Sequence, residues 1–285
     1  MPGRVPSCPS FAGGLVRFAR REFRDAVSGK WFLLYTVAFA VLAVGVSYLS
    51  LSGVGSHGFA GFGRTAAGLL NLIMLVVPLM ALTCGAGSIA GERERGTLLY
   101  LLAQPVSRAQ VLLGKYLGLA GALVCSLCVG FGVSAGVLAW RAGGVGVGAF
   151  GVLIGLAALL ALAMLSVGFL ISVVSRRTGV ATSLALFVWL GLVFVSDLGL
   201  MAGTVLFRLR VQEIFGLATA NPLQSFKMAV IVNMNASLDV LGPVGAYASH
   251  TLGDALGWVL VSSLAAWTVV PLALAVTLFT RRGSV

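Results

Sequence analysis

The chain is poor in charge, and poorest in acid. Of its 285 residues only 8 are Asp or Glu, and charged residues make up 9% of the sequence. A soluble globular domain carries about 25% charged and about 45–50% apolar residues, whereas the apolar share here is 59%. This shortage of charge excludes an ordinary water-soluble domain. It predicts an all-α protein that crosses a membrane several times.

Cysteine is also scarce, and the four residues are Cys8, Cys84, Cys125 and Cys128. Three of them lie inside apolar runs, so no disulfide framework is expected. Cys125 and Cys128 would share one helix face, and soft sulfur ligands suit Cu(I), but cysteine is often just a small buried apolar residue. The remaining soft or imidazole candidates are His57, Met228, Met234 and His250. Their scatter gives no ligand spacing, so we predict no metal site and leave contact with copper open.

The N-terminal segment shows no cleavable signal peptide, because the first apolar run starts only at Trp31 and no clear small-residue cleavage site follows. Residues 11–30 instead place Leu15, Ala19 and Phe23 at helical spacing. The opposite side carries Arg17, Arg20, Arg21 and Arg24. This pattern is typical of an amphipathic helix that lies in the membrane interface among anionic lipid head groups. A merely solvated basic leader is the alternative. We therefore predict a cytoplasmic N-terminus and interfacial helix at 1–30.

Six apolar runs fill most of the remaining domain, 31–285, and about 20 apolar residues suffice to cross the hydrocarbon layer. The predicted spans are 31–51, 66–90, 109–139, 146–174, 180–206 and 254–279. The basic residues set the orientation, since cytoplasmic loops carry an excess of Lys and Arg. With both termini inside, 14 of the 19 basic residues are cytoplasmic. Because the basic residues adjoin hydrophobic segments, the net charge of +11 indicates a lipid surface rather than nucleic acid.

Two polar features belong to the outer half of this topology. Residues 207–253 form the largest non-spanning region, yet they stay apolar, which predicts short helices at the outer face rather than a free domain. They would form either a gate or docking surface for an outside partner, or a packed lid without a ligand. Asp197 is the clearest ionisable residue inside a span, so it is a functional candidate by default, unless it simply reaches outer water.

The densest charge in the chain lies at 91–105. Glu92, Arg93, Glu94 and Arg95 stand between two apolar runs. We expect a short helix outside the membrane, with Thr97 capping its start and Pro105 ending it. Ser107 and Gln110 then have the spacing of a capping box, which predicts the start of the next long helix.

This stretch carries a family resemblance. Gly91 to Leu98, followed by Gln104-Pro105-Val106-Ser107-Arg108 and Leu113-Gly114-Lys115-Tyr116, resembles the cytoplasmic elbow of ABC-2 type transporter permeases. The six-span layout and the late outer helices match that family as well. Within the family the chain resembles the branch that serves maturation of the copper enzyme nitrous-oxide reductase. The features here are Phe194-Val195-Ser196-Asp197-Leu198, Asn221-Pro222 and Phe279-Thr280-Arg281-Arg282.

The resemblance implies a coupling helix at 91–105 that seats in a groove of a separate cytoplasmic ATPase. Glu92 and Glu94 would pair with basic residues of that partner, and Leu98 and Leu101 would supply apolar anchoring. The implied coupling residues are Gly91, Glu92, Arg93, Glu94, Arg95, Gly96, Thr97, Leu98, Leu101, Pro105 and Arg108. A surface ion-pair cluster of little energetic weight is the alternative.

The ATPase itself is not expected in this chain. The string nearest to a phosphate-binding loop, 109–116, lacks its first Gly and its final Ser or Thr. No catalytic residue and no cofactor are therefore predicted, and ATP and Mg would be bound by the partner. The resemblance implies a homodimer of this chain in the inner membrane, with a dimer of the cytoplasmic ATPase bound to it. It also implies a periplasmic β-helix partner and a copper chaperone.

Two alternative hypotheses remain, one an ABC-2 exporter and the other an intramembrane protease or an ion-coupled carrier. An ABC-2 exporter of a lipid, peptide or drug would use the same elbow. An intramembrane protease would need paired Glu/His or Ser/His groups within its spans, which the sequence lacks. An ion-coupled carrier would show several intramembrane charges, for which one Asp is thin support.

Overall fold

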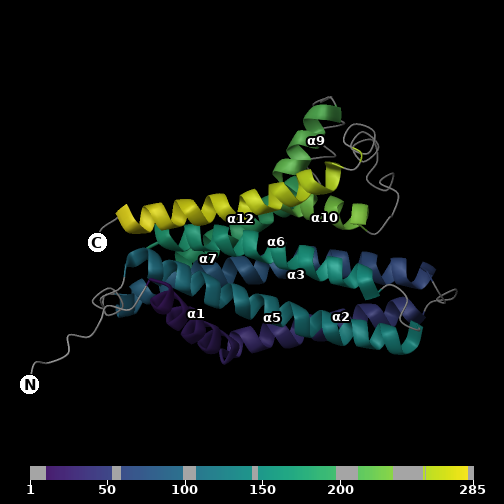
Figure 1. The fold of residues 1–285 in the computed structure, drawn as a ribbon, viewed down its shortest axis with the longest axis horizontal. Helices are drawn as coiled ribbons and strands as arrows, with labels where there is room; N and C mark the ends of the chain where they lie inside the picture. The colour runs from purple at the N-terminus through teal and green to yellow at the C-terminus, as the bar shows by residue number, and fades with distance from the viewer. Residues whose placement is uncertain are drawn as a thin grey trace, which may run out of the picture.

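The computed structural model describes residues 11–52, 59–98, 107–142, 147–196, 211–233, 253 and 255–281. Every regular element in these ranges is a helix (Figure 1). The helices are α1 (Phe11–Val27), α2 (Lys30–Ser52), α3 (Phe59–Glu94), α5 (Arg108–Ala142), α6 (Val147–Val174), α7 (Thr178–Phe194), α9 (Val211–Ala220), α10 (Pro222–Asn233) and α12 (Ala255–Arg281). The predicted all-α class is thus confirmed for this part of the chain.

Four stretches are long and apolar enough to cross a membrane, and they coincide with the second, third, fourth and sixth predicted spans. They are Gly68–Glu94, Arg108–Gly136, Gly151–Val174 and Ala255–Arg281. The first predicted span lies in α2. A fifth candidate arises when α1 and α2 are taken together as one pair of helices, bent by 63°. The described part of the chain therefore holds four or five candidate spans, and a total of six stays a prediction.

The fifth predicted span, 180–206, is described only in its first part. Apolar α7, Thr178–Phe194, is 17 residues long and covers this span from its start at residue 180 to Phe194. At a rise of about 1.5 Å per residue this helix is about 25 Å long, a little less than the roughly 30 Å of hydrocarbon. Residues 197–206, with the candidate Asp197, lie outside the described ranges.

The long helices α3, α5, α6 and α12 run side by side along the length of the molecule (Figure 1). α6 packs against both α3 and α12, while α5 packs against α1 and α2. At one end of the bundle lie α1 and the last turns of α12, and at the other end lie α9 and α10 (Figure 1). The N-terminal helix and the predicted outer helices thus lie at opposite ends.

α1 confirms the predicted amphipathic helix. Its four arginines are exposed, and Leu15, Ala19 and Phe23 are partly buried. The buried side rests on α5 at two glycines. An added Cβ at Gly114 would come 2.6 Å from the Cβ of Phe18, and one at Gly118 would come 2.7 Å from the carbonyl oxygen of Ala19. These glycines let the two backbones approach closely, as small residues do between helices in lipid.

The α3–α6 pair uses the same device. Gly85 of α3 faces Gly168 of α6. A Cβ built on either glycine would lie 3.0 Å from the Cα of the other. Nearby, the Ser172 hydroxyl of α6 accepts hydrogen bonds from the backbone N–H groups of Ile89 and Ala90, each at 2.9 Å. The last turns of α3 are therefore held against α6 by backbone contact and by side-chain hydrogen bonds.

The predicted outer region contains α9 and α10, which meet at Asn221. Asn221 Oδ1 accepts from the N–H of Leu223 at 3.0 Å and so caps α10, where Pro222 takes the first helical position. The Asn221 amide donates to the carbonyl of Leu192 at 2.9 Å, and the Gln224 amide donates to Ser196 at 2.6 Å. α10 also packs against α12 and α6, so α10 is a packed part of the bundle.

We expect Gly118→Ala to loosen α1 from α5. The new methyl group would overlap α1, and overpacking of this kind costs about 1–3 kcal/mol. Gly132→Ala is the matched control on the same helix, since no atom lies within 4 Å of its Cβ position. SDS-induced unfolding in mixed micelles measures both variants. Equal stability of the two variants would contradict the close α1–α5 contact.

Candidate functional site

The charged stretch 91–98, called the elbow below, forms the end of α3 and the turn that follows it. Glu92, Arg93 and Glu94 lie in the last turn of α3 rather than in a separate short helix. The N–H of Gly96 donates to the carbonyl of Arg93 at 3.2 Å. Gly96 has φ +71°, a left-handed conformation that glycine adopts without strain and that commonly ends helices. The sequence Arg95-Gly96 therefore works as a helix stop.

The chain resumes helical structure at Thr97 and Leu98, and residues 99–106 lie outside the described ranges. These include the candidates Leu101 and Pro105. The Thr97 hydroxyl donates to the carbonyl of Glu92 at 3.3 Å, so in the described residues it closes the end of α3. The N–H groups that it was predicted to cap are not among them.

The predicted capping box at the start of α5 is confirmed. The N–H of Ser107 donates to Gln110 Oε1 at 2.8 Å, and the N–H of Gln110 donates to Ser107 Oγ at 3.2 Å. This reciprocal pair satisfies two N–H groups that a helix start leaves open. The candidate Arg108 is the first residue of α5, directly inside this cap.

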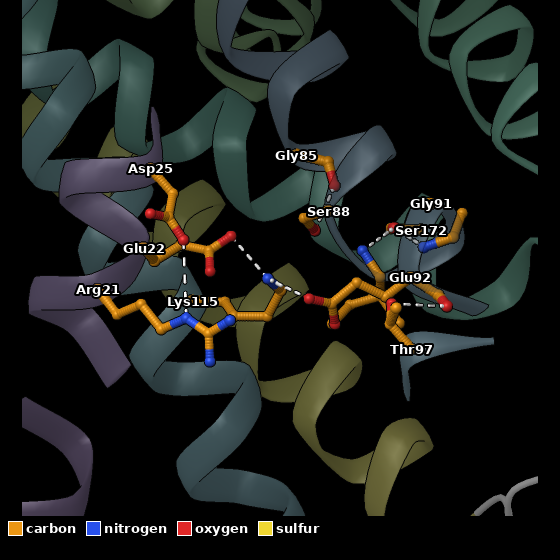
Figure 2. A network of polar contacts seen from close by, with 12 residues as sticks. Arg21, Glu22, Asp25, Gly85, Ser88, Gly91, Glu92, Thr97, Lys115 and Ser172 are labelled. Atoms are coloured by element: carbon orange, nitrogen blue, oxygen red, sulfur yellow. Dashed lines mark hydrogen bonds and ion pairs between the residues drawn. The ribbon is translucent and has the colours of Figure 1, made fainter. Parts of the chain in front are cut away.

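A buried lysine links the elbow to α1. Lys115 Nζ lies 2.6 Å from Glu22 Oε1 of α1 and 2.9 Å from Glu92 Oε1 of α3 (Figure 2). The Lys115 side chain is 5% exposed, and those of Glu22 and Glu92 are 23% and 15% exposed. Taking an ammonium group out of water costs several kcal/mol, and close carboxylates with good geometry offset this cost. One side chain of α5 thereby joins two helices that are far apart in sequence.

Sequence reasoning missed this trio. Lys115 was quoted only as part of the family pattern, and Glu22 was not singled out at all. The available signal was position: Glu22 is adjacent to Phe23 and three residues after Ala19, so it lies near the apolar side of the predicted helix. An acid there needs a partner in the packed structure.

The other elbow charges contact the α6–α7 junction. The Arg93 guanidinium donates to the carbonyl of Ser175, just after α6, at 2.8 Å. The Glu94 carboxylate accepts from the N–H of Thr178, the first residue of α7, at 2.9 Å. A carboxylate at a helix N-terminus satisfies an open N–H and interacts favourably with the helix dipole. Glu92 and Glu94 therefore both have partners within the chain.

The outward part of the elbow is short. Glu94, Arg95, Gly96 and Thr97 are exposed, whereas Leu98 is only 6% exposed and packs in the core of the bundle. The structure thus uses Leu98 internally, where the family resemblance implied apolar anchoring of a partner. Gly91, also buried, supports the last turn of α3: its carbonyl accepts from Arg95 Nε at 3.0 Å. The surface that the described part of the elbow offers to another protein is therefore polar and consists of residues 94–97.

The metal candidates lie apart. Cys125 and Cys128 are exposed on α5, while Met228 is buried in α10. His57, Met234 and His250 lie outside the described ranges. Within the described residues no group of three or more His, Cys, Asp or Glu side chains is close enough to hold a metal ion.

Replacing the buried lysine tests the trio. Lys115→Met would leave Glu22 and Glu92 close together without a cation, and breaking a buried pair in this way costs about 3–5 kcal/mol. Lys30→Met, at the exposed start of α2, should change stability by less than about 0.5 kcal/mol. Combining Lys115→Met with Glu22→Gln and Glu92→Gln should restore part of the loss. Equal SDS unfolding of the two lysine variants would refute the role of the trio.

Comparison with known proteins gives the family. The profile described as ABC-2 family transporter protein matches residues 17–284. A "Probable ABC transporter permease protein NosY" from Stutzerimonas stutzeri is 33% identical over 270 residues, which is 93% of this chain and 97% of that protein. A protein of the same name from Pseudomonas aeruginosa is 33% identical over 271 residues, again 93% and 97% of the two chains. This chain belongs to the ABC-2 family and is a permease, the membrane subunit of an ABC transporter.

Proposed function

We propose that the exposed tip of the elbow, Glu94 to Thr97, receives conformational work from a separate cytoplasmic ATPase. The observation that carries the proposal is the way this tip is attached. Four exposed residues, three of them polar, stand on a turn whose side chains connect it to α1, α5, α6 and α7. A loosely attached loop would absorb a push, whereas this turn would pass it to several spans at once.

Each contact of the elbow side chains joins the end of α3 to a different helix. Lys115 joins the end of α3 to α5 and α1 through Glu92 and Glu22. Arg93 and Glu94 join it to the end of α6 and the start of α7. Such packed groups move as rigid bodies rather than by continuous bending. A displacement of the tip would therefore shift the cytoplasmic ends of these helices together.

The opposite end of the bundle provides an outlet for the motion. Glu94 of α3 contacts the first residue of α7, Thr178. Near and just after the other end of α7, the carbonyl groups of Leu192 and Ser196 accept hydrogen bonds from Asn221 and Gln224, which belong to the α9–α10 segment. A shift of α7 would thus be passed to the outer helices. On this proposal residues 207–253 form a docking surface rather than a passive lid.

The complete assembly follows the family. We propose six spans with both termini cytoplasmic, a homodimer of this chain, and an ATPase dimer that binds ATP and Mg at the inner membrane. The share of Lys and Arg on the predicted inner side supports the orientation. The elbow lies close to α1, whose arginine-rich face fits that side.

We further propose that the transporter serves maturation of nitrous-oxide reductase. Similarity to two permeases named NosY along 93% of the chain supports this branch over an exporter of lipids, peptides or drugs. On this proposal an outer β-helix partner and a copper chaperone bind the copper. The role of this chain is then to signal across the membrane.

A charge reversal at the tip tests coupling. Glu94→Lys in the reconstituted complex should reduce the stimulation of the ATPase by about 5- to 150-fold, which is the fold-change that usual coupling free energies produce. Glu94→Gln keeps an oxygen that can accept from Thr178 and should retain more activity. Asp25→Lys, exposed on α1 and outside the tip, is the matched charge reversal and should have little effect.

Cross-linking separates contact from folding in the same experiment. In a chain whose native cysteines are replaced by alanine, Arg95→Cys or Thr97→Cys should form an adduct with the ATPase, while Gln212→Cys on α9 should not. Absence of an adduct from both tip positions would overturn the coupling proposal.

The outer partner is tested by capture. The purified complex should retain a periplasmic β-helix protein, and Gln212→Cys should cross-link to it while Thr97→Cys does not. Stimulation of the ATPase by a lipid, peptide or drug substrate, without any retained outer protein, would favour the exporter instead.

A further inference from the structure

The charges of α1 are segregated between its two sides. Its four arginines, at positions 17, 20, 21 and 24, are all exposed. One of its two acids, Glu22, is bound to the buried Lys115 (Figure 2). The other, Asp25, lies 3.7 Å from Arg21 and is itself exposed, so this pair is weak. The exposed side of α1 therefore carries a net charge of about +3.

These arginines surround a hollow rather than a flat surface. A depression of about 550 Å³ is lined by Arg17, Arg20, Arg21, Phe23, Arg24, Val27 and Ser28. Planar guanidinium groups match the oxygens of a phosphate and bind them with paired hydrogen bonds. Apart from Arg17, which donates to the carbonyl of Gly13, and Arg21, these guanidinium groups have no hydrogen bond or ion pair among the described residues. The hollow thus fits a phosphate-bearing anion.

Apolar surface follows this basic hollow along the chain, and Val27, which lines the hollow, is itself 41% exposed. The chain turns at Ser28 and Gly29 into α2, which meets α1 at 63° in the bent pair. Along α2 the side chains of Leu33, Val37 and Val41 are 60%, 51% and 64% exposed. Only lipid or another apolar surface covers such a stripe favourably. A molecule with a phosphate at one end and hydrocarbon at the other fits both parts.

We propose that the hollow on α1 is a binding site for an anionic phospholipid. Its phosphate is held by Arg20 and Arg24, which lie one turn apart, and its acyl chains descend along α2. Free phosphate and nucleic acid satisfy the arginines but leave the apolar stripe of α2 without a partner. The proposal is independent of the coupling role, because it requires neither an ATPase nor an outer protein.

The test is lipid retention by the purified full-length protein. After washing in neutral detergent, the protein is titrated with phosphatidylglycerol or phosphatidylcholine, and bound lipid is counted by native mass spectrometry. Each basic residue near an anionic surface contributes about fivefold to binding. R20Q/R24Q should therefore weaken phosphatidylglycerol binding about 25-fold. R176Q/R281Q removes the same charge from two other exposed positions and should leave binding nearly unchanged.

Three results would overturn the site: equal weakening by the two double variants, equal retention of phosphatidylcholine, or displacement of the lipid by glycerol phosphate or a short DNA duplex at comparable concentration. SDS unfolding checks that both variants are folded. If R20Q/R24Q is unstable, the single variant Arg20→Gln should still weaken binding about fivefold. An unchanged affinity in a folded Arg20→Gln variant would equally contradict the proposal.

Discussion

The structure depends on one buried ammonium group. Lys115 is almost fully covered, so its charge is tolerable only while Glu22 and Glu92 both lie within hydrogen-bond distance. That requirement fixes where α1 docks on α5 and where α3 must end. The elbow begins at this contact, and Gly96, Arg93 and Glu94 set the geometry of the charged tip beyond it.

Glycine makes this arrangement sterically possible. Within lipid, helices gain little from hydrophobic association and rely on close packing instead. Gly118 brings α1 onto α5 one turn from Lys115, and Gly85 with Gly168 bring α3 onto α6 near the elbow. Close backbone contact and buried charge therefore occur at the same end of the bundle. The opposite end of the bundle instead uses amide side chains, Asn221 and Gln224, to satisfy carbonyls at and after the end of α7.

Several features were readable from sequence because they depend on neighbours along the chain. Apolar length predicted the long helices, the arginine pattern predicted α1, and the spacing of Ser107 and Gln110 predicted the cap of α5. The partners of the elbow charges within the chain were not predicted. Glu92 and Glu94 were expected to pair with another protein, which stays a prediction, and the structure gives them Lys115 and Thr178 as internal partners. Sequence spacing gives the face of a helix, but it does not say which distant helix lies opposite.

The sequence by itself determined that this chain is helical, embedded in lipid and interrupted by a charged turn at 91–98, because hydropathy and helix capping act over a few residues. It also carried the family pattern. Only the tertiary structure decided that Leu98 turns inward and that Glu22 belongs with the elbow. The second outcome depends on a contact between residues 93 positions apart, and such contacts are settled by packing and by the cost of leaving a buried charge unpaired.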